Sequence, residues 1–142
     1  MDIARLDNLL LELTDSERAY CAGARYDWND AFSSGHQQNI SEKHIHKIGD
    51  QTRALHQEGM PEGLSIVRNS RFNPVPEHVH NYVEISYVYR GHAPQVVNGA
   101  QLTLAQNEVL LLDAACPHAV GELGEHDIML SIVISRPMCT AA

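Results

Sequence analysis

Three histidines and one glutamate have the types and spacing of a metal-binding set. Residues 78–84 read HVHNYVE, and side chains alternate between the two faces of a strand, so His78, His80 and Glu84 point the same way. His118 follows the apolar run 109–112, and a neighbouring antiparallel strand could place it opposite the other three. Imidazole nitrogen and carboxylate oxygen suit Zn, Ni, Fe, Mn or Cu. The set therefore predicts a divalent transition metal without selecting one. The alternative is that these residues line a pocket or lie at a strand end.

The same alternation predicts which neighbours share the interior face. Tyr82, Ser86 and Val88 have the parity of the metal set, so they are candidates for contact with a small ligand or for packing inside the fold. Arg90 also falls on this face. Because a charged side chain is costly to bury, we expect the strand to end or bulge before Gly91.

From residue 64 onward the sequence is typical of a β protein. Six segments are rich in β-branched and aromatic residues: 64–67, 83–89, 95–97, 101–104, 109–112 and 128–134. Asn98-Gly99 predicts a two-residue hairpin turn between two of them, because these residue types tolerate positive φ. Many short strands with little between them indicate a sandwich or barrel.

The first third of the chain predicts helices instead. Apolar residues recur at helical spacing over 3–13, with Asp2 as N-cap, and a capping box at 14–17 begins a second helix toward Cys21. Residues 24–39 predict a loop, and 41–58 predict a third helix that ends at Gly59. We therefore expect a helical extension over 1–63, packed outside a β barrel over 64–142, within one structural domain.

Composition limits the class of protein. The chain has 142 residues, a net charge of -8 and ten Lys and Arg, which argues against a nucleic-acid-binding surface. Three cysteines without a C-x-x-C spacing argue against a disulfide framework and favour the cytoplasm. Neither a signal peptide nor an apolar stretch of about 18 residues is present, so no membrane association is expected.

The remaining candidates for chemistry are weaker. His44 and His46 form a second H-x-H pair, with His56 further on, but in a helix residues two apart face different ways. Cys116 is expected to serve as a small buried hydrophobic residue. The sequence has no Gly-rich phosphate loop and no G-x-S-x-G nucleophile motif.

The wider frame of the metal set resembles the cupin superfamily. His78-x-His80-x3-Glu84-x6-Gly91 is similar to the first cupin motif, and 107–118 is similar to the second. Where the family has glycines or proline, this chain has Phe72, Asn107, Asp113 and Ala115. The resemblance covers about residues 64–134 and implies an antiparallel β barrel, the double-stranded β-helix or jelly roll, with His78, His80, Glu84 and His118 as ligands.

A narrower resemblance follows from the phrase PEHVHNYVEISYVYRG over 76–91 and the hairpin after it. It is similar to the effector-sensing N-terminal domain of AraC-type transcription regulators. This resemblance implies a homodimer that binds a small-molecule effector, and a separate C-terminal helix-turn-helix domain, absent from these 142 residues, that binds DNA. The alternative is a metal-dependent cupin enzyme such as a dioxygenase or isomerase, since the same four ligands leave coordination positions open.

Overall fold

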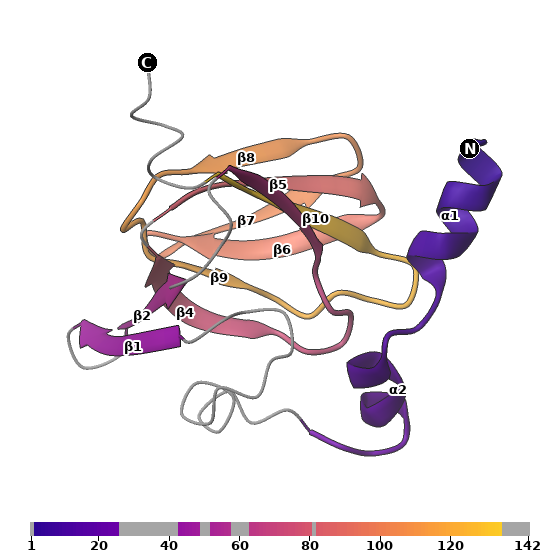
Figure 1. Ribbon diagram of the computed structural model, residues 1–142, viewed down its shortest axis with the longest axis horizontal. Coiled ribbons are helices and arrows are strands. Elements are labelled where there is room, and N and C mark those ends of the chain that lie inside the picture. The colour runs from indigo at the N-terminus through magenta and orange to yellow at the C-terminus, as the bar shows by residue number, and fades with distance from the viewer. Residues whose placement is uncertain (1, 26–42, 49–51, 58–62, 81, 135–142) are drawn as a thin grey trace.

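In the part of the chain that the structure describes, ten strands form two sheets and two helices lie near the N-terminus (Figure 1). The computed structural model describes residues 2–25, 43–48, 52–57, 63–80 and 82–134, with only the backbone in 43–48 and 52–57. The six-stranded sheet has the order β1 (Lys43–Ile48), β2 (Thr52–Gln57), β4 (Val75–His80), β9 (His118–Val120), β6 (His92–Val97), β7 (Ala100–Ala105). The four-stranded sheet has the order β3 (Leu64–Arg68), β10 (Ile128–Ile134), β5 (Val83–Arg90), β8 (Val109–Leu112). The mainly β class and the jelly-roll type of fold predicted from the sequence are confirmed. The described strands form two separate sheets and do not close into a barrel.

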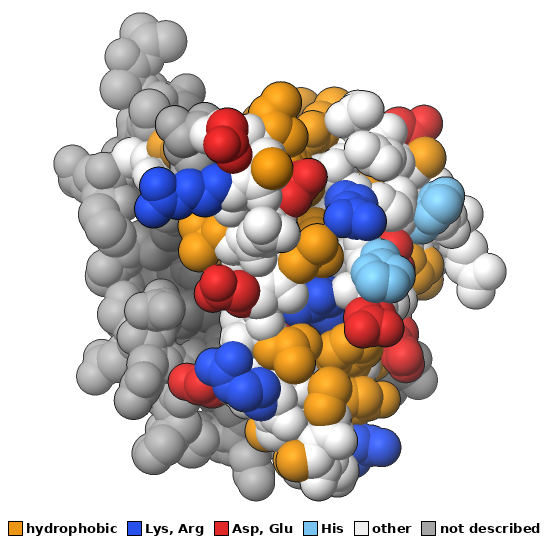
Figure 2. Space-filling model, turned by 90° about the vertical axis from the view of Figure 1, so that its right-hand side faces the viewer, with side chains coloured by type: hydrophobic (Ala, Val, Ile, Leu, Met, Phe, Trp, Pro, Cys, Tyr) orange, Lys and Arg blue, Asp and Glu red, His pale blue; other side chains and the backbone are white. Residues whose placement is uncertain are grey.

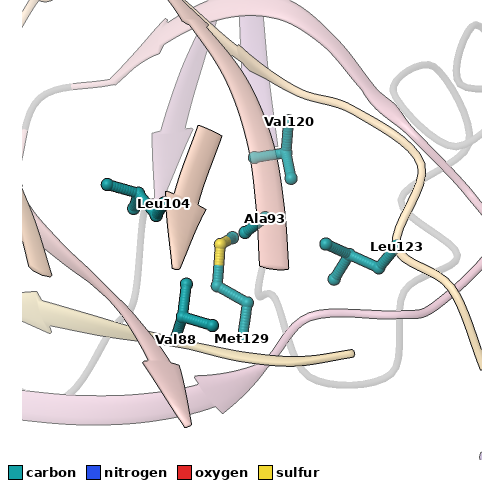
Figure 3. Packing of buried hydrophobic residues seen from close by; sticks show 6 residues of the cluster. All are labelled: Val88, Ala93, Leu104, Val120, Leu123 and Met129. Carbon is teal, nitrogen blue, oxygen red and sulfur yellow. The ribbon is translucent and has the colours of Figure 1, made fainter. Parts of the chain in front are cut away.

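The core lies between the two sheets. Its buried cluster, shown in Figure 3, consists of Val88, Ala93, Leu104, Val120, Leu123 and Met129. Burial alternates along β5, where residues 84, 86 and 88 are buried and 83, 85 and 87 are only partly so. The predicted parity of this strand is therefore confirmed, because one face of β5 is turned toward the opposite sheet.

Two local predictions about the strands are also confirmed. Asn98 and Gly99 have φ of 49° and 79°, and Val97 pairs with Ala100, as a two-residue turn with two positive φ angles requires. β5 ends at Arg90, and its register with β10 shifts between Ile128 and Met129. This bulge is the irregularity expected before Gly91.

Both predicted N-terminal helices are present. α1 (Ile3–Leu11) begins where the Asp2 carboxylate accepts from the Arg5 amide, and α2 (Asp15–Cys21) begins at the capping box formed by Thr14 and Glu17. They lie to one side of the sheets (Figure 1), and charges of both signs are interspersed with apolar side chains on that face (Figure 2). No helix of the described residues is long and apolar enough to cross a membrane.

The predicted third helix over 41–58 is wrong. This segment contains β1 and β2, which pair with each other as antiparallel strands, and β2 also pairs in parallel with β4. The β-branched Ile45 and Ile48 fit strands better than a helix, and the pairing with β4 is a tertiary contact that local sequence does not reveal. The argument against a metal site at His44 and His46 assumed a helix, so it no longer holds. The side chains of both residues lie outside the part of the chain that the structure describes. The domain boundary at residue 63 stays a prediction, as does the loop over 24–39, most of which is not described.

Three residues at glycine positions of the cupin motifs keep a glycine-like backbone. Phe72, Asn107 and Ala115 have φ of 69°, 68° and 64°. Left-handed backbone costs a residue with a Cβ roughly 1 kcal/mol. The turns of both motifs are therefore retained with other residue types, and each substitution carries some conformational strain.

Candidate metal centre

Two sheets supply the four predicted metal ligands. His78 on β4 is paired directly with His118 on β9, and His80 lies two residues further along β4 on the same face. Glu84 comes from β5 in the opposite sheet. All four residues are buried, with exposed fractions between 1% and 7%. The site thus lies between the sheets, where water is largely excluded.

The three imidazoles lie together, and Glu84 adjoins two of them. One nitrogen from each of His78, His80 and His118 lies within 4.8 Å of the other two. Glu84 Oε2 lies 3.1 Å from His80 Nε2 and 4.0 Å from His118 Nε2. Two nitrogens bound to one metal at about 2.1 Å lie about 3.4 Å apart in tetrahedral geometry and at most about 4.2 Å apart, so the imidazoles would have to move closer together by roughly 1 Å to bind one ion.

Each imidazole is oriented by a backbone carbonyl. The Nδ1 atoms of His78, His80 and His118 lie 2.8, 2.9 and 2.9 Å from the carbonyl oxygens of residues 76, 82 and 116, respectively. A carbonyl only accepts, so each Nδ1 carries a proton, and in the neutral form of each ring the lone pair is on Nε2. This is the arrangement that metal-binding histidines commonly have, with the second nitrogen held by an outer hydrogen bond.

The contact between His80 and Glu84 requires a positive charge between the two side chains. Nδ1 of His80 donates to a carbonyl, and Nε2 lies 3.1 Å from the carboxylate oxygen. Two lone pairs at this distance repel unless a proton or a metal ion lies between the two atoms. The donor set, its burial and this contact therefore fit a divalent metal.

Burial and neighbouring charges set the protonation of the cluster. Burial, reinforced by His118, lowers the pKa of His78 to about 3, and burial also lowers the pKa of His118. Burial alone would raise the pKa of Glu84, but hydrogen bonds from His80 and Ser131 outweigh it and lower the pKa to about 2. At neutral pH, His78 and His118 are therefore neutral and Glu84 is charged, as metal ligands must be.

Two of the three predicted ligand-contacting residues adjoin this cluster. The Tyr82 ring stacks on His80, with centroids 3.8 Å apart, and burial followed by the charge of Glu84 raises the pKa of Tyr82. Ser86 Oγ lies 3.4 Å from Glu84 Oε1, and Val88 belongs to the hydrophobic core. Tyr82 and Ser86 thus adjoin the candidate metal centre, and the contact of all three residues with a ligand stays a prediction.

Two residues near the centre were not found from the sequence. Ser131 donates a 2.7 Å hydrogen bond to Glu84 Oε1, and Asn69 Nδ2 lies 2.7 Å from Ser131 Oγ. Ser131 is the polar residue inside the otherwise apolar strand 128–134, which is a signal that could have identified it. Asn69 offers no comparable pattern, because it follows β3 and reaches Ser131 only through the fold.

A shallow surface groove lies apart from this cluster. Its volume is about 470 Å³, and it is lined by Pro94, Gln95, Val96, Gln101, Leu102, Thr103 and Gly121. None of the four candidate ligands borders it. Cys116 is half-buried with a free thiol, and its carbonyl orients His118.

The fold and the buried three-histidine cluster are those expected of a cupin. Residues 67–134 match the family described as the AraC-like ligand binding domain. The resemblance inferred from the sequence is thereby confirmed for this part of the chain. No curated protein matches the chain.

Several solved structures are similar at low identity. KdgF from Halomonas sp. is 17% identical, with 55% of this chain and 74% of that one covered and a TM-score of 0.48. A cupin 2 conserved barrel domain protein from Salinispora arenicola is 22% identical, with coverage of 53% and 64% and a TM-score of 0.44. A predicted oxalate decarboxylase from Thermotoga maritima is 22% identical, with coverage of 51% and 64% and a TM-score of 0.43.

Proposed function

We propose that this chain is the metal-binding, effector-sensing domain of an AraC-type transcription regulator. The family of residues 67–134 supports the binding of a small molecule. The observation that carries the metal part is the buried cluster of His78, His80 and His118, in which one nitrogen of each ring lies within 4.8 Å of the other two and each Nδ1 is held by a carbonyl. When bound, a divalent metal offers a Lewis-acidic centre to an oxygen or nitrogen atom of the effector.

His78, His80, His118 and Glu84 would hold the metal. Tyr82 and Ser86 would contact an effector bound at the open coordination positions of the metal, since both residues adjoin the cluster from the interior face. Burial keeps water from competing with such a ligand, and the carbonyls on Nδ1 keep the imidazoles in place.

The metal part is tested by metal analysis of the purified protein. Protein prepared without chelator is expected to carry about one equivalent of a transition metal or to bind one on titration with Zn²⁺. Replacing both His78 and His80 by alanine should abolish this binding. His126→Ala is the matched control, because His126 is exposed and lies outside the cluster. Wild-type protein that neither carries metal nor binds it contradicts the proposal.

The homodimer part is supported by an apolar outer face on the four-stranded sheet. Ile66, Ile132, Ile85 and Leu111 are register partners across all its strands, and Ile66 and Leu111 are 61% and 67% exposed. Contiguous exposed apolar surface commonly marks a protein contact. Sedimentation should therefore give a dimer for the wild type and a smaller species for Leu111→Glu. A wild-type monomer at all concentrations contradicts this part.

The regulator and the enzyme hypotheses differ in what the complete gene encodes. A reading frame that continues past residue 142 into a basic segment with two helix-turn-helix patterns supports the regulator. In that case, DNA binding by the full-length protein should change when the effector is added to the metal-loaded form. Turnover of a small molecule by metal-loaded protein, lost in the double histidine variant, would instead support the cupin enzyme.

A further inference from the structure

The two oxygens of the Glu84 carboxylate have different surroundings. Oε2 faces the imidazoles, 3.1 Å from His80 Nε2. Oε1 accepts a 2.7 Å hydrogen bond from Ser131 Oγ, and Ser86 Oγ lies at a longer 3.4 Å. Hydroxyl hydrogen bonds to carboxylates are strong near 2.5–2.7 Å and weak beyond about 3.0 Å. Ser131 is therefore the main partner of Oε1.

The direction of the Ser131 hydrogen bond is fixed by Asn69. Asn69 Nδ2 lies 3.4 Å from the Met129 carbonyl oxygen, which only accepts, so this atom is the amide nitrogen and not the oxygen. The same Nδ2 donates to Ser131 Oγ at 2.7 Å, and the Asn69 backbone amide donates to Met129 O at 2.9 Å. Ser131 accepts from Asn69, so its own proton is directed at Glu84.

We propose that Ser131, oriented by Asn69, is a positioning residue that holds Glu84 as a metal ligand through Oε2 alone. This inference rests on the proposed metal site. With Oε1 engaged by the hydroxyl, the protein supplies three nitrogens and one oxygen. A metal that accepts five or six donors then keeps positions open for an oxygen or nitrogen donor of a small ligand. Without the Ser131 hydroxyl, Oε1 is free to bind the metal and to occupy one of these positions.

The test is the electronic absorption of the Co²⁺-loaded protein, because the intensity of the cobalt d–d bands falls as the coordination number rises. Ser131→Ala should give weaker bands than the wild type and reduced binding of azide as a probe ligand. Ser65→Ala is the matched control, because it removes a hydroxyl from the same sheet, on β3, and Ser65 Oγ has no hydrogen-bond partner among the described residues. Its spectrum should remain that of the wild type. Loss of such outer partners commonly weakens metal binding about 10- to 100-fold, so spectra are compared at saturating Co²⁺.

If the Co²⁺ spectrum of Ser131→Ala coincides with that of the wild type, the inference is overturned, whatever the affinity of the variant for Co²⁺. Far-UV circular dichroism of the metal-free protein checks the fold. If Ser131→Ala does not fold, Asn69→Asp gives the same test, because its carboxylate accepts the Ser131 proton and withdraws it from Glu84. Wild-type protein that binds no Co²⁺ refutes the metal site itself, whereas a normal wild-type spectrum unchanged in the variants refutes only the role of Ser131.

Discussion

Replacement of Glu17 by glutamine should strongly destabilise the protein, because its carboxylate joins the N-terminal helices to the β sheets. Glu17 is completely buried and accepts from the backbone amides of Thr14 and Arg71 at 2.8 Å. It also accepts from Arg71 Nε at 3.0 Å and from the Arg68 guanidinium at 3.0 Å. Arg71 is itself 2% exposed, so glutamine would leave a buried guanidinium without its counter-charge.

Two independent considerations give the magnitude. Breaking a buried ion pair by removing one partner costs about 3–5 kcal/mol. Burial alone would raise the pKa of Glu17, but hydrogen bonds from Arg71, Thr14 and Arg68 lower it from 4.5 to about 2. At 1.36 kcal/mol for each pKa unit, this favours the charged form by about 3 kcal/mol in the folded state. For a chain of this length, such a loss lowers Tm by roughly 10–15 °C.

The assay is urea unfolding followed by far-UV circular dichroism, with EDTA present so that metal binding does not contribute. Glu17→Gln should lose about 3–5 kcal/mol at pH 7. Glu125→Gln is the matched control: Glu125 is exposed, and it bonds Arg71 only through its carbonyl oxygen, which the substitution keeps. The control should remain within about 0.5 kcal/mol of the wild type.

The pH dependence gives a second check. The folded-state pKa of Glu17 lies below its ordinary value, so its stabilising contribution is complete above about pH 4.5 and is lost as pH falls toward 2. The stability gap between wild type and Glu17→Gln should thus be about 2 kcal/mol smaller at pH 3 than at pH 7. Equal stability of the two glutamine variants at pH 7 would contradict the stabilising role of the Glu17 carboxylate. A stability difference between wild type and Glu17→Gln that does not change with pH would contradict it as well.

Three further predictions concern the turns and the metal centre. Ala115→Gly should stabilise the protein by about 1 kcal/mol, since Ala115 has a φ of 64°, whereas Ala114→Gly should not; thermal unfolding compares the two. Gly91→Ala should destabilise by more than about 2 kcal/mol in denaturant titration, because a Cβ there would lie 2.0 Å from Asp127 Oδ1. Gly99→Ala, with a similar φ and open space, should cost only about 1 kcal/mol, and equal losses would contradict the steric argument. Zn²⁺ affinity, measured by competition with a chelating dye, should fall as pH approaches 3, because each histidine must be neutral to coordinate and burial lowers the pKa of His78 to about 3; an affinity independent of pH would argue against imidazole ligands.

Local patterns predicted most of the β fold correctly. The Asn98-Gly99 turn, the alternating burial along β5 and both N-terminal helix caps depend on residues close together in the sequence. These features could therefore be predicted from the sequence. The third helix failed for the opposite reason. Its residues pair as β1 and β2, and β2 is held against β4 by hydrogen bonds to a strand more than 20 residues away.

The amino-acid sequence alone identified the candidate ligands and the shared face of His78 and His80, because strand alternation is a local property. How the four side chains meet depends on the fold. It pairs His78 with His118 across two strands, brings Glu84 from the opposite sheet, and sets backbone carbonyls against each Nδ1. It also decided the roles of Ser131, Asn69 and the Glu17–Arg71 pair, since these contacts join residues 47 to 62 positions apart. Contacts over such separations depend on how the sheets pack, and no local pattern encodes them.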